Sequence, residues 1–203
     1  MITTGTVSSA PVFDEERHLY FLDGKNVPSV SRILRPITSA AYGAIDKDVL
    51  LRAAEFGTAV HACTEFLDEG ELDESSVQPE WVPYIDAYKA WKRDMHPTIL
   101  NIECRFACSK YAGTIDRIAR IGDEDWIVDI KTTSEIHPHV GLQLAAYEAL
   151  VRNFAGASKR LRRAALQLRG DGTYRFKVFN DLSDYPCFSA LLHIYAWPKK
   201  NEH

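Results

Sequence analysis

The segment from Gly113 to Thr132 constrains the fold more than any other part of the sequence. Isoleucine and valine favour strands and recur through it, and the run Gly122-Asp-Glu-Asp125 interrupts them as a turn would. We therefore predict a hairpin of two strands within residues 111–133. Its apolar positions are those expected of central strands: Ile115, Ile118, Ile127, Val128 and Ile130.

Three charged side chains interrupt this apolar hairpin. If Ile121 pairs with Trp126 across a four-residue loop, Asp116 lies opposite Lys131, and Asp129 shares the face of Lys131 because the two are two residues apart. At ~5 Å and an effective dielectric of about 20, two carboxylates repel by about 3 kcal/mol, so one is protonated or a cation lies between them.

A divalent cation accounts for this arrangement, and hard oxygen ligands favour Mg²⁺ or Mn²⁺. Such an ion neutralises a phosphodiester and activates a water, which Lys131 would orient or deprotonate. The alternative is a plain cross-strand salt bridge between Asp116 and Lys131, with Asp129 solvated.

The rest of the chain predicts an α/β fold with a central mixed β-sheet flanked by helices. It reads as a single domain over residues 1–203, with an N-terminal hairpin and short helix at about 12–36 leading into the core. Asp23-Gly24 suits the hairpin turn, and Ser29 suits the cap of a helix that ends at Pro36. Further helices are expected at about 46–67, 80–95, 140–154 and 186–195, and further strands at 99–108 and on both sides of Gly170-Asp171-Gly172.

Composition sets wider limits. The net charge of −4 argues against a surface coated with positive charge, although a local basic groove remains compatible with it. No apolar run approaches the ~18 to 20 residues that a bilayer span requires, and the polar start differs from a secretory signal, so we expect a cytoplasmic protein without membrane contact. The aromatic stripe of the 80–95 helix favours core packing over a base-stacking platform.

Separated blocks of the sequence resemble the PD-(D/E)XK nuclease superfamily, in particular its RecB-like and phage-type exonuclease branch, which includes the mitochondrial genome maintenance exonucleases. The blocks are Gly57-Thr-Ala-Val-His61 with Glu65, then Gly113-Thr-Ile-Asp116, Val128-Asp-Ile-Lys-Thr132 and Gln143-Leu-Ala-Ala-Tyr147. The early segments from His18 and Val27 are also similar to phage-type members, so the resemblance spans residues 13 to 150. Ile115 replaces the proline that the superfamily places before its first acid.

The resemblance implies a restriction-endonuclease-like core and a role for each matched residue. Asp116, Asp129, Lys131 and Gln143 would be catalytic, and His61, Asp116, Asp129 and Ile130 would surround Mg²⁺ or Mn²⁺. Glu65 would contact a second metal or a water, or it is a solvated helix-surface glutamate. Glu103, on the strand before the hairpin, would support the ligands from outside or lie at a solvated edge. Tyr147 would also support the site, or it packs the helix onto the sheet.

The function implied is a metal-dependent deoxyribonuclease that degrades DNA from its ends, in phage-type recombination, repair or DNA turnover, in the bacterial host cytoplasm if the chain is phage-encoded. A structure-specific or single-strand endonuclease of the same fold is the first alternative, and a non-catalytic nucleic-acid-binding module is the second. A recombination partner protein and a homo-oligomer are both compatible with this class. Phosphate contacts are expected from two basic groups: Arg160, Arg162 and Arg163, and Lys89, Lys92 and Arg93.

The four cysteines bear on the cofactor, because some RecB-like relatives carry an iron-sulfur cluster. Only Cys104 and Cys108 lie close together in the sequence, and no CxxC pair occurs. We therefore expect buried free thiols and no iron-sulfur cluster.

Overall fold

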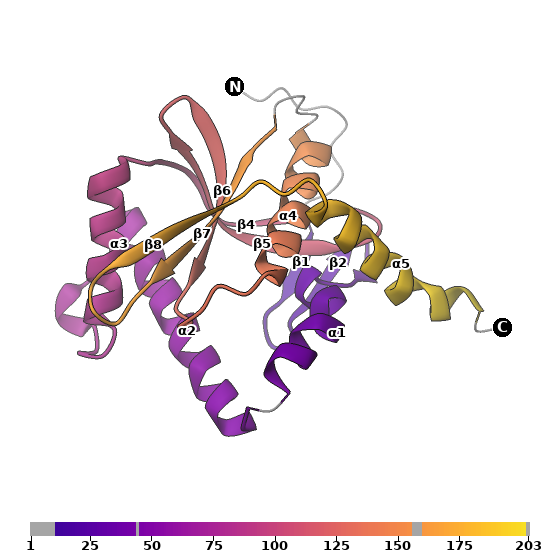
Figure 1. Cartoon of the computed structure of the whole chain (residues 1–203), viewed down its shortest axis with the longest axis horizontal. Coiled ribbons are helices and arrows are strands. Elements are labelled where there is room, and N and C mark those ends of the chain that lie inside the picture. The colour runs from indigo at the N-terminus through magenta and orange to yellow at the C-terminus, as the bar shows by residue number, and fades with distance from the viewer. Residues whose placement is uncertain (1–10, 44, 156–159, 202–203) are drawn as a thin grey trace.

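The computed structural model describes residues 11–43, 45–155 and 160–201, and it is built around a five-stranded mixed sheet. The strand order is β4-β5-β6-β7-β8, in which β6 and β7 are parallel and the other neighbours are antiparallel (Figure 1). The strands are β4 Thr98–Ala107, β5 Ala112–Ile121, β6 Glu124–Lys131, β7 Arg162–Leu168 and β8 Tyr174–Phe179. The predicted α/β class with a central mixed sheet is confirmed.

Helices cover both faces of this sheet, because successive residues of its central strands point to opposite sides. Trp126, Val128 and Ile130 of β6 pack in one core cluster with α2 (Lys47–Glu69) and α3 (Val82–Met95). Ile127 packs in the other cluster, with α1 (Val30–Tyr42), α4 (His139–Ala155) and α5 (Asp184–Asn201) (Figure 1). The hairpin is therefore buried on both faces, as its sequence predicted.

The N-terminal hairpin is confirmed and belongs to a separate three-stranded sheet. Strands β1 Val12–Asp14, β2 Leu19–Leu22 and β3 Lys25–Val27 pair antiparallel in that order. Asp23 and Gly24 both have positive φ, which is the backbone of a type I′ turn. Tyr20 OH lies 2.7 Å from Thr114 Oγ1, so this small sheet is tied to β5.

Two local predictions are wrong. The first helix continues through Pro36 to Tyr42: the proline removes one backbone hydrogen bond from the helix interior, and Ile33 and Leu34 anchor the helix in the core. The β5–β6 loop has two residues instead of four, since Ile121 pairs with Glu124 and Arg117 with Val128.

The shorter loop shifts the register by two residues. The last observed pair is Arg117 with Val128, and the next position in the same register places Asp116 opposite Asp129 instead of Lys131. A shift of two leaves every side chain on its predicted face, because the strand repeat is also two.

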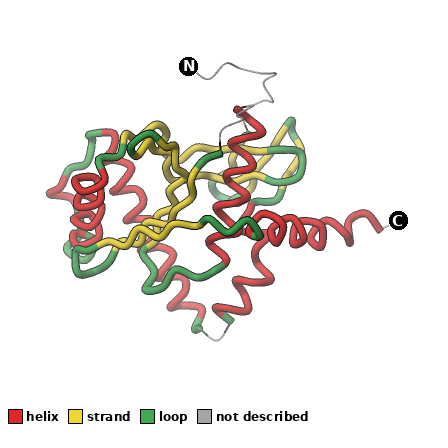
Figure 2. The backbone as a smooth tube through the Cα atoms, turned by 45° about the horizontal axis from the view of Figure 1, so that its top comes forward, coloured by secondary structure: helices red, strands yellow, loops and turns green. Residues whose placement is uncertain are grey.

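The aromatic stripe of α3 is core, as the sequence favoured. Ile85, Tyr88 and Trp91 are buried, and Trp91 stacks on Phe176 of β8 with ring centroids 6.2 Å apart. Among the described residues, the helices include none with both the length and the apolar character needed to cross a bilayer. Figure 2 shows α5 projecting away from the sheet at the C-terminal end of the described chain.

Candidate metal centre

The end of β6 brings the predicted site residues together between α2 and α4. His61 of α2 places its Nε2 3.1 Å from the main-chain oxygen of Ile130. A carbonyl can only accept a hydrogen bond, so Nε2 carries the proton and, in the neutral ring, Nδ1 carries the lone pair. The Ile130 carbonyl therefore orients His61, and the metal contact that the resemblance implied for Ile130 stays a prediction.

Asp116 of β5 completes a close pair of acceptors with His61. Its Oδ2 accepts a hydrogen bond of 2.7 Å from the Ile130 amide and lies 3.7 Å from His61 Nδ1. Two lone-pair-bearing atoms at this distance repel unless a proton or a metal ion lies between them. The ring nitrogen and the carboxylate are suitable ligands for a divalent ion such as Mn²⁺.

Glu103 of β4 is the third potential ligand in this place. Ligand atoms of His61, Glu103 and Asp116 all lie within 4.8 Å of one another. Burial, together with the neighbouring charge of Asp116, raises the pKa of Glu103 to about 8, and the Arg117 guanidinium opposes that rise. Glu65, one turn after His61, adds to the negative charge that acts on Glu103.

The predicted Asp129–Lys131 pair lies beside this group and forms a second part of the site. Lys131 Nζ is 2.7 Å from Asp129 Oδ2, so the ammonium and this buried carboxylate form a close ion pair. Burial raises the pKa of Asp129, the Lys131 ammonium opposes this, and Asp116 adds to it. A buried carboxylate is costly unless it is paired, and here the Lys131 ammonium is the cation beside it.

The polar residues of α4 hold Lys131 from the other side. Gln143 Oε1 accepts from Lys131 Nζ at 3.5 Å, and Gln143 Nε2 donates to Tyr147 OH at 3.0 Å. Burial raises the pKa of Tyr147 well above its ordinary value, so its hydroxyl stays neutral. The helical four-residue spacing thus places Gln143 against the lysine and Tyr147 behind it.

Two glycines allow the helices to approach the site, and they differ in how tightly they are packed. A Cβ on Gly113 would lie 2.5 Å from Tyr147 Cε1, whereas a Cβ on Gly57 would lie 3.4 Å from Thr132 Oγ1. Tyr147 is buried, so its ring has little room to move.

We expect Gly113→Ala to lower the free energy of unfolding by about 1–3 kcal/mol, because the added methyl overpacks the Tyr147 ring. Denaturant unfolding measures this, and Gly57→Ala is the matched control. Since Gly57 lies within a helix, where alanine is about 0.5–1 kcal/mol more favourable than glycine, that variant is expected to be at least as stable as the parent. Equal stabilities for the two variants would contradict this account of the packing.

One residue of the site region was missed by the sequence analysis. Arg117 is fully buried in β5 and donates to Asp68, Thr64, Glu103 and the main chain of Asp116. The sequence held a signal for it, because an arginine between Ile115 and Ile118 in a central strand has to find buried partners.

All six predicted phosphate-contact residues form ion pairs within the chain. Arg163 differs most from the expectation, because its side chain is 3% exposed and pairs with Glu148 and Asp184. Lys92 pairs with buried Asp68. The others are partly exposed, each with an acidic neighbour: Lys89 with Glu74, Arg93 with Asp94, Arg160 with Glu148 and Arg162 with Glu124.

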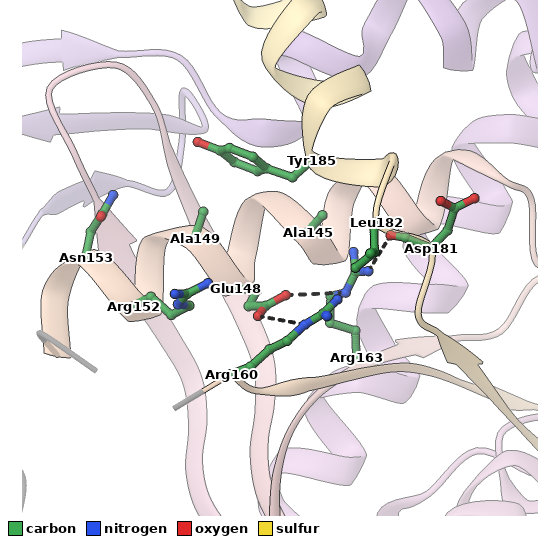
Figure 3. A pocket seen from close by; sticks show the side chains of 10 residues that line it. All are labelled: Ala145, Glu148, Ala149, Arg152, Asn153, Arg160, Arg163, Asp181, Leu182 and Tyr185. Atoms are coloured by element: carbon green, nitrogen blue, oxygen red, sulfur yellow. Dashed lines mark hydrogen bonds and ion pairs between the residues drawn. The ribbon is translucent and has the colours of Figure 1, made fainter. Parts of the chain in front are cut away.

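Arg160 and Arg163 also line a cavity of about 580 Å³, which Figure 3 shows between α4 and the start of α5. It opens on the side of α4 that carries Glu148 and Arg152, away from Gln143 and Tyr147. The cavity is therefore separate from the candidate metal centre.

The four cysteines are free thiols, but the predicted burial holds for Cys63 alone: Cys104 and Cys108 are half-buried and Cys187 is exposed. Cys63 belongs to the core cluster of α2 and α3, whereas Cys104 and Cys108 pack against the cluster on the other face of the sheet. These three sulfur atoms therefore do not converge on one place.

Comparisons with known proteins add little to the geometry. No protein-family model and no curated protein sequence matches the chain. A solved structure described as "Crystal structure of SSO0001" is similar, with a TM-score of 0.41 and 13% identity over 90% of this chain and 80% of that one.

Proposed function

We propose that this protein is a metal-dependent DNA exonuclease with a PD-(D/E)XK-type core. The observation that carries the proposal is the close approach of His61 Nδ1 and Asp116 Oδ2, 3.7 Å apart, with Glu103 beside them. The Asp129–Lys131 pair lies beside them at the end of β6. A divalent ion bound there would supply charge neutralisation on a phosphate and an acidified water.

The residues of the chain divide the remaining work. Asp116 and His61 are the first ligands, and each is held by the main chain of Ile130, through its amide and its carbonyl respectively. Lys131 is the ammonium group nearest the buried carboxylates, so it is suited to orient the attacking water and to offset developing negative charge. Gln143 restricts where that ammonium can lie.

The salt-bridge alternative is less well supported by this geometry. In the observed register Asp116 is not the partner of Lys131, and the Lys131 ammonium pairs with Asp129 instead. Asp116 is left facing a histidine lone pair and Glu103, which a structural salt bridge would not require.

End-labelled linear DNA, single-stranded and double-stranded, tests the proposal when it is incubated with Mg²⁺ or Mn²⁺ and, separately, with a chelator. We expect progressive shortening from the ends with metal and none with chelator. Lys131→Ala protein, purified in the same way, controls for a contaminating nuclease. Absence of cleavage with either metal, or equal cleavage in chelator, would refute the proposal.

A covalently closed single-stranded circle distinguishes the exonuclease from the endonuclease alternative. An exonuclease leaves the circle intact because it has no end, whereas an endonuclease linearises and then degrades it. Specific DNA binding without any cleavage would instead favour the non-catalytic module.

A further inference from the structure

The strongest unassigned feature of the molecule is the buried guanidinium of Arg117. Its side chain has no exposed area, although a buried cation is costly unless it is fully paired. Nε donates to Asp68 Oδ2 at 2.7 Å, Nη2 to Thr64 Oγ1 at 3.1 Å, and Nη1 to the Asp116 main-chain oxygen at 2.6 Å. The guanidinium thus links α2 to β5 at Asp116, which is a proposed metal ligand.

The far side of this link is anchored firmly in the scaffold. The Asp68 side chain is also fully buried, and it accepts from Tyr88 OH and from Lys92 Nζ, each at 2.6 Å. Tyr88 and Lys92 both belong to α3, so Asp68 is fixed from two helices. The Arg117 guanidinium is therefore held in place by Asp68, and it can position a second group that it contacts.

The second group that the Arg117 guanidinium contacts is the Glu103 carboxyl group. Arg117 Nη1 is 3.4 Å from Glu103 Oε1, which is the longest of its contacts. A carboxylate has about four acceptor sites, so this single contact leaves capacity on Glu103. Glu103 lies opposite Asp116, between the pairs Ile102–Arg117 and Cys104–Ile115, and has a φ of 45°, so the strand is distorted at this residue.

The Arg117 guanidinium leaves much of the Glu103 and Asp116 carboxyl groups available to a ligand. Its shortest side-chain contact is with Asp68, which also accepts from Lys92. It reaches Glu103 through one longer contact, and it donates to the main-chain oxygen of Asp116. Carboxyl oxygens of Glu103 and Asp116 close to the His61 ring nitrogen are suitable ligands for a divalent cation.

We propose that Glu103 is a protein ligand of the divalent ion, together with His61 and Asp116, and that Arg117 is the positioning residue that holds Glu103 in place. This inference rests on the proposed function, because it concerns the ion of the same site. It changes the ligand set implied by the sequence, in which Glu103 stood outside the ligands and Arg117 had no role.

Mn²⁺ affinity, measured by calorimetric titration of the full chain without DNA, is the primary test. Glu103→Gln keeps the shape of the side chain and removes its charge, and we expect it to weaken Mn²⁺ binding about tenfold or more. Arg117→Lys keeps the charge but cannot reproduce the planar set of contacts, and it is expected to weaken Mn²⁺ binding about tenfold through misplacement of Glu103.

The double variant Arg117→Lys/Glu103→Gln shows whether the two residues act together. If Arg117 acts through Glu103, the double variant binds Mn²⁺ about as well as Glu103→Gln alone. Fully additive losses would overturn the positioning role of Arg117. Unchanged Mn²⁺ affinity in Glu103→Gln would overturn the ligand assignment. Glu103 is partly exposed, so Glu103→Gln is expected to fold, and it tests the ligand assignment even if Arg117→Lys fails to fold.

Arg163→Lys is the matched control. Arg163 is a second buried arginine of the sheet, paired with Glu148 and Asp184 away from the metal centre. It is expected to lose stability as Arg117→Lys does but to keep the parent Mn²⁺ affinity. A comparable loss of Mn²⁺ affinity in Arg163→Lys would show that destabilisation alone explains the Arg117 effect and would overturn its positioning role.

The parent protein separates failure of this inference from failure of the proposed function. If the parent neither binds Mn²⁺ nor cleaves DNA, the metal centre itself is wrong and the inference falls with it. If the parent binds Mn²⁺ and cleaves DNA while Glu103→Gln matches its affinity, only the inference fails.

Discussion

Replacing Lys131 with alanine is expected to slow DNA hydrolysis by about 10²- to 10⁴-fold while Mn²⁺ stays bound. The lysine is placed to act on the water and the phosphate, and the ligand pair of His61 and Asp116 does not include it. Single-turnover cleavage at saturating Mn²⁺ measures the rate, and calorimetric titration measures metal affinity.

Lys47→Ala is the matched control for Lys131→Ala. Lys47 is an exposed lysine at the start of α2, about four turns before His61, so its loss removes the same charge without touching the site. We expect that variant to cleave DNA at close to the parent rate. Parent-like cleavage by Lys131→Ala, or an equal loss in both variants, would show that Lys131 has no special role in hydrolysis.

The second large effect is expected for Asp116→Asn, which should lose both metal binding and hydrolysis. The amide keeps the size of the side chain, and its oxygen can still accept from the Ile130 amide, so the strand is expected to stay folded. What disappears is the negative charge facing His61. We expect Mn²⁺ affinity to fall by about 10- to 100-fold or more, and hydrolysis to fall to the background level.

Asp125→Asn on the same hairpin controls for charge removal. Asp125 pairs with Arg120 at the far end of the hairpin, outside the metal centre, so its replacement should leave Mn²⁺ affinity and cleavage unchanged. Circular dichroism of both variants verifies that the fold is retained. Full Mn²⁺ affinity in a folded Asp116→Asn protein would exclude Asp116 as a ligand.

The sequence alone determined the elements whose signals are local. Ser29 accepts from the Arg32 amide and Asp46 from the amides of Asp48 and Val49, so both helix starts lie where short polar side chains predict them. Asp23-Gly24 forms the predicted turn because both residues adopt the positive φ angles that this turn requires. The face shared by Asp129 and Lys131 was equally predictable, since alternation along a strand does not depend on its partners.

Only the tertiary structure decided the features that depend on distant partners. The β5–β6 register depends on pairing along the whole hairpin, and the helix through Pro36 depends on core packing by Ile33 and Leu34. The position of Arg117 in an apolar strand signals burial but not its partners, and Arg163 lies in a basic cluster that is usually solvated; each is buried because carboxylates from other elements meet it. Charge pairing is set by distance in space, so a sequence can name the charged residues but not their partners.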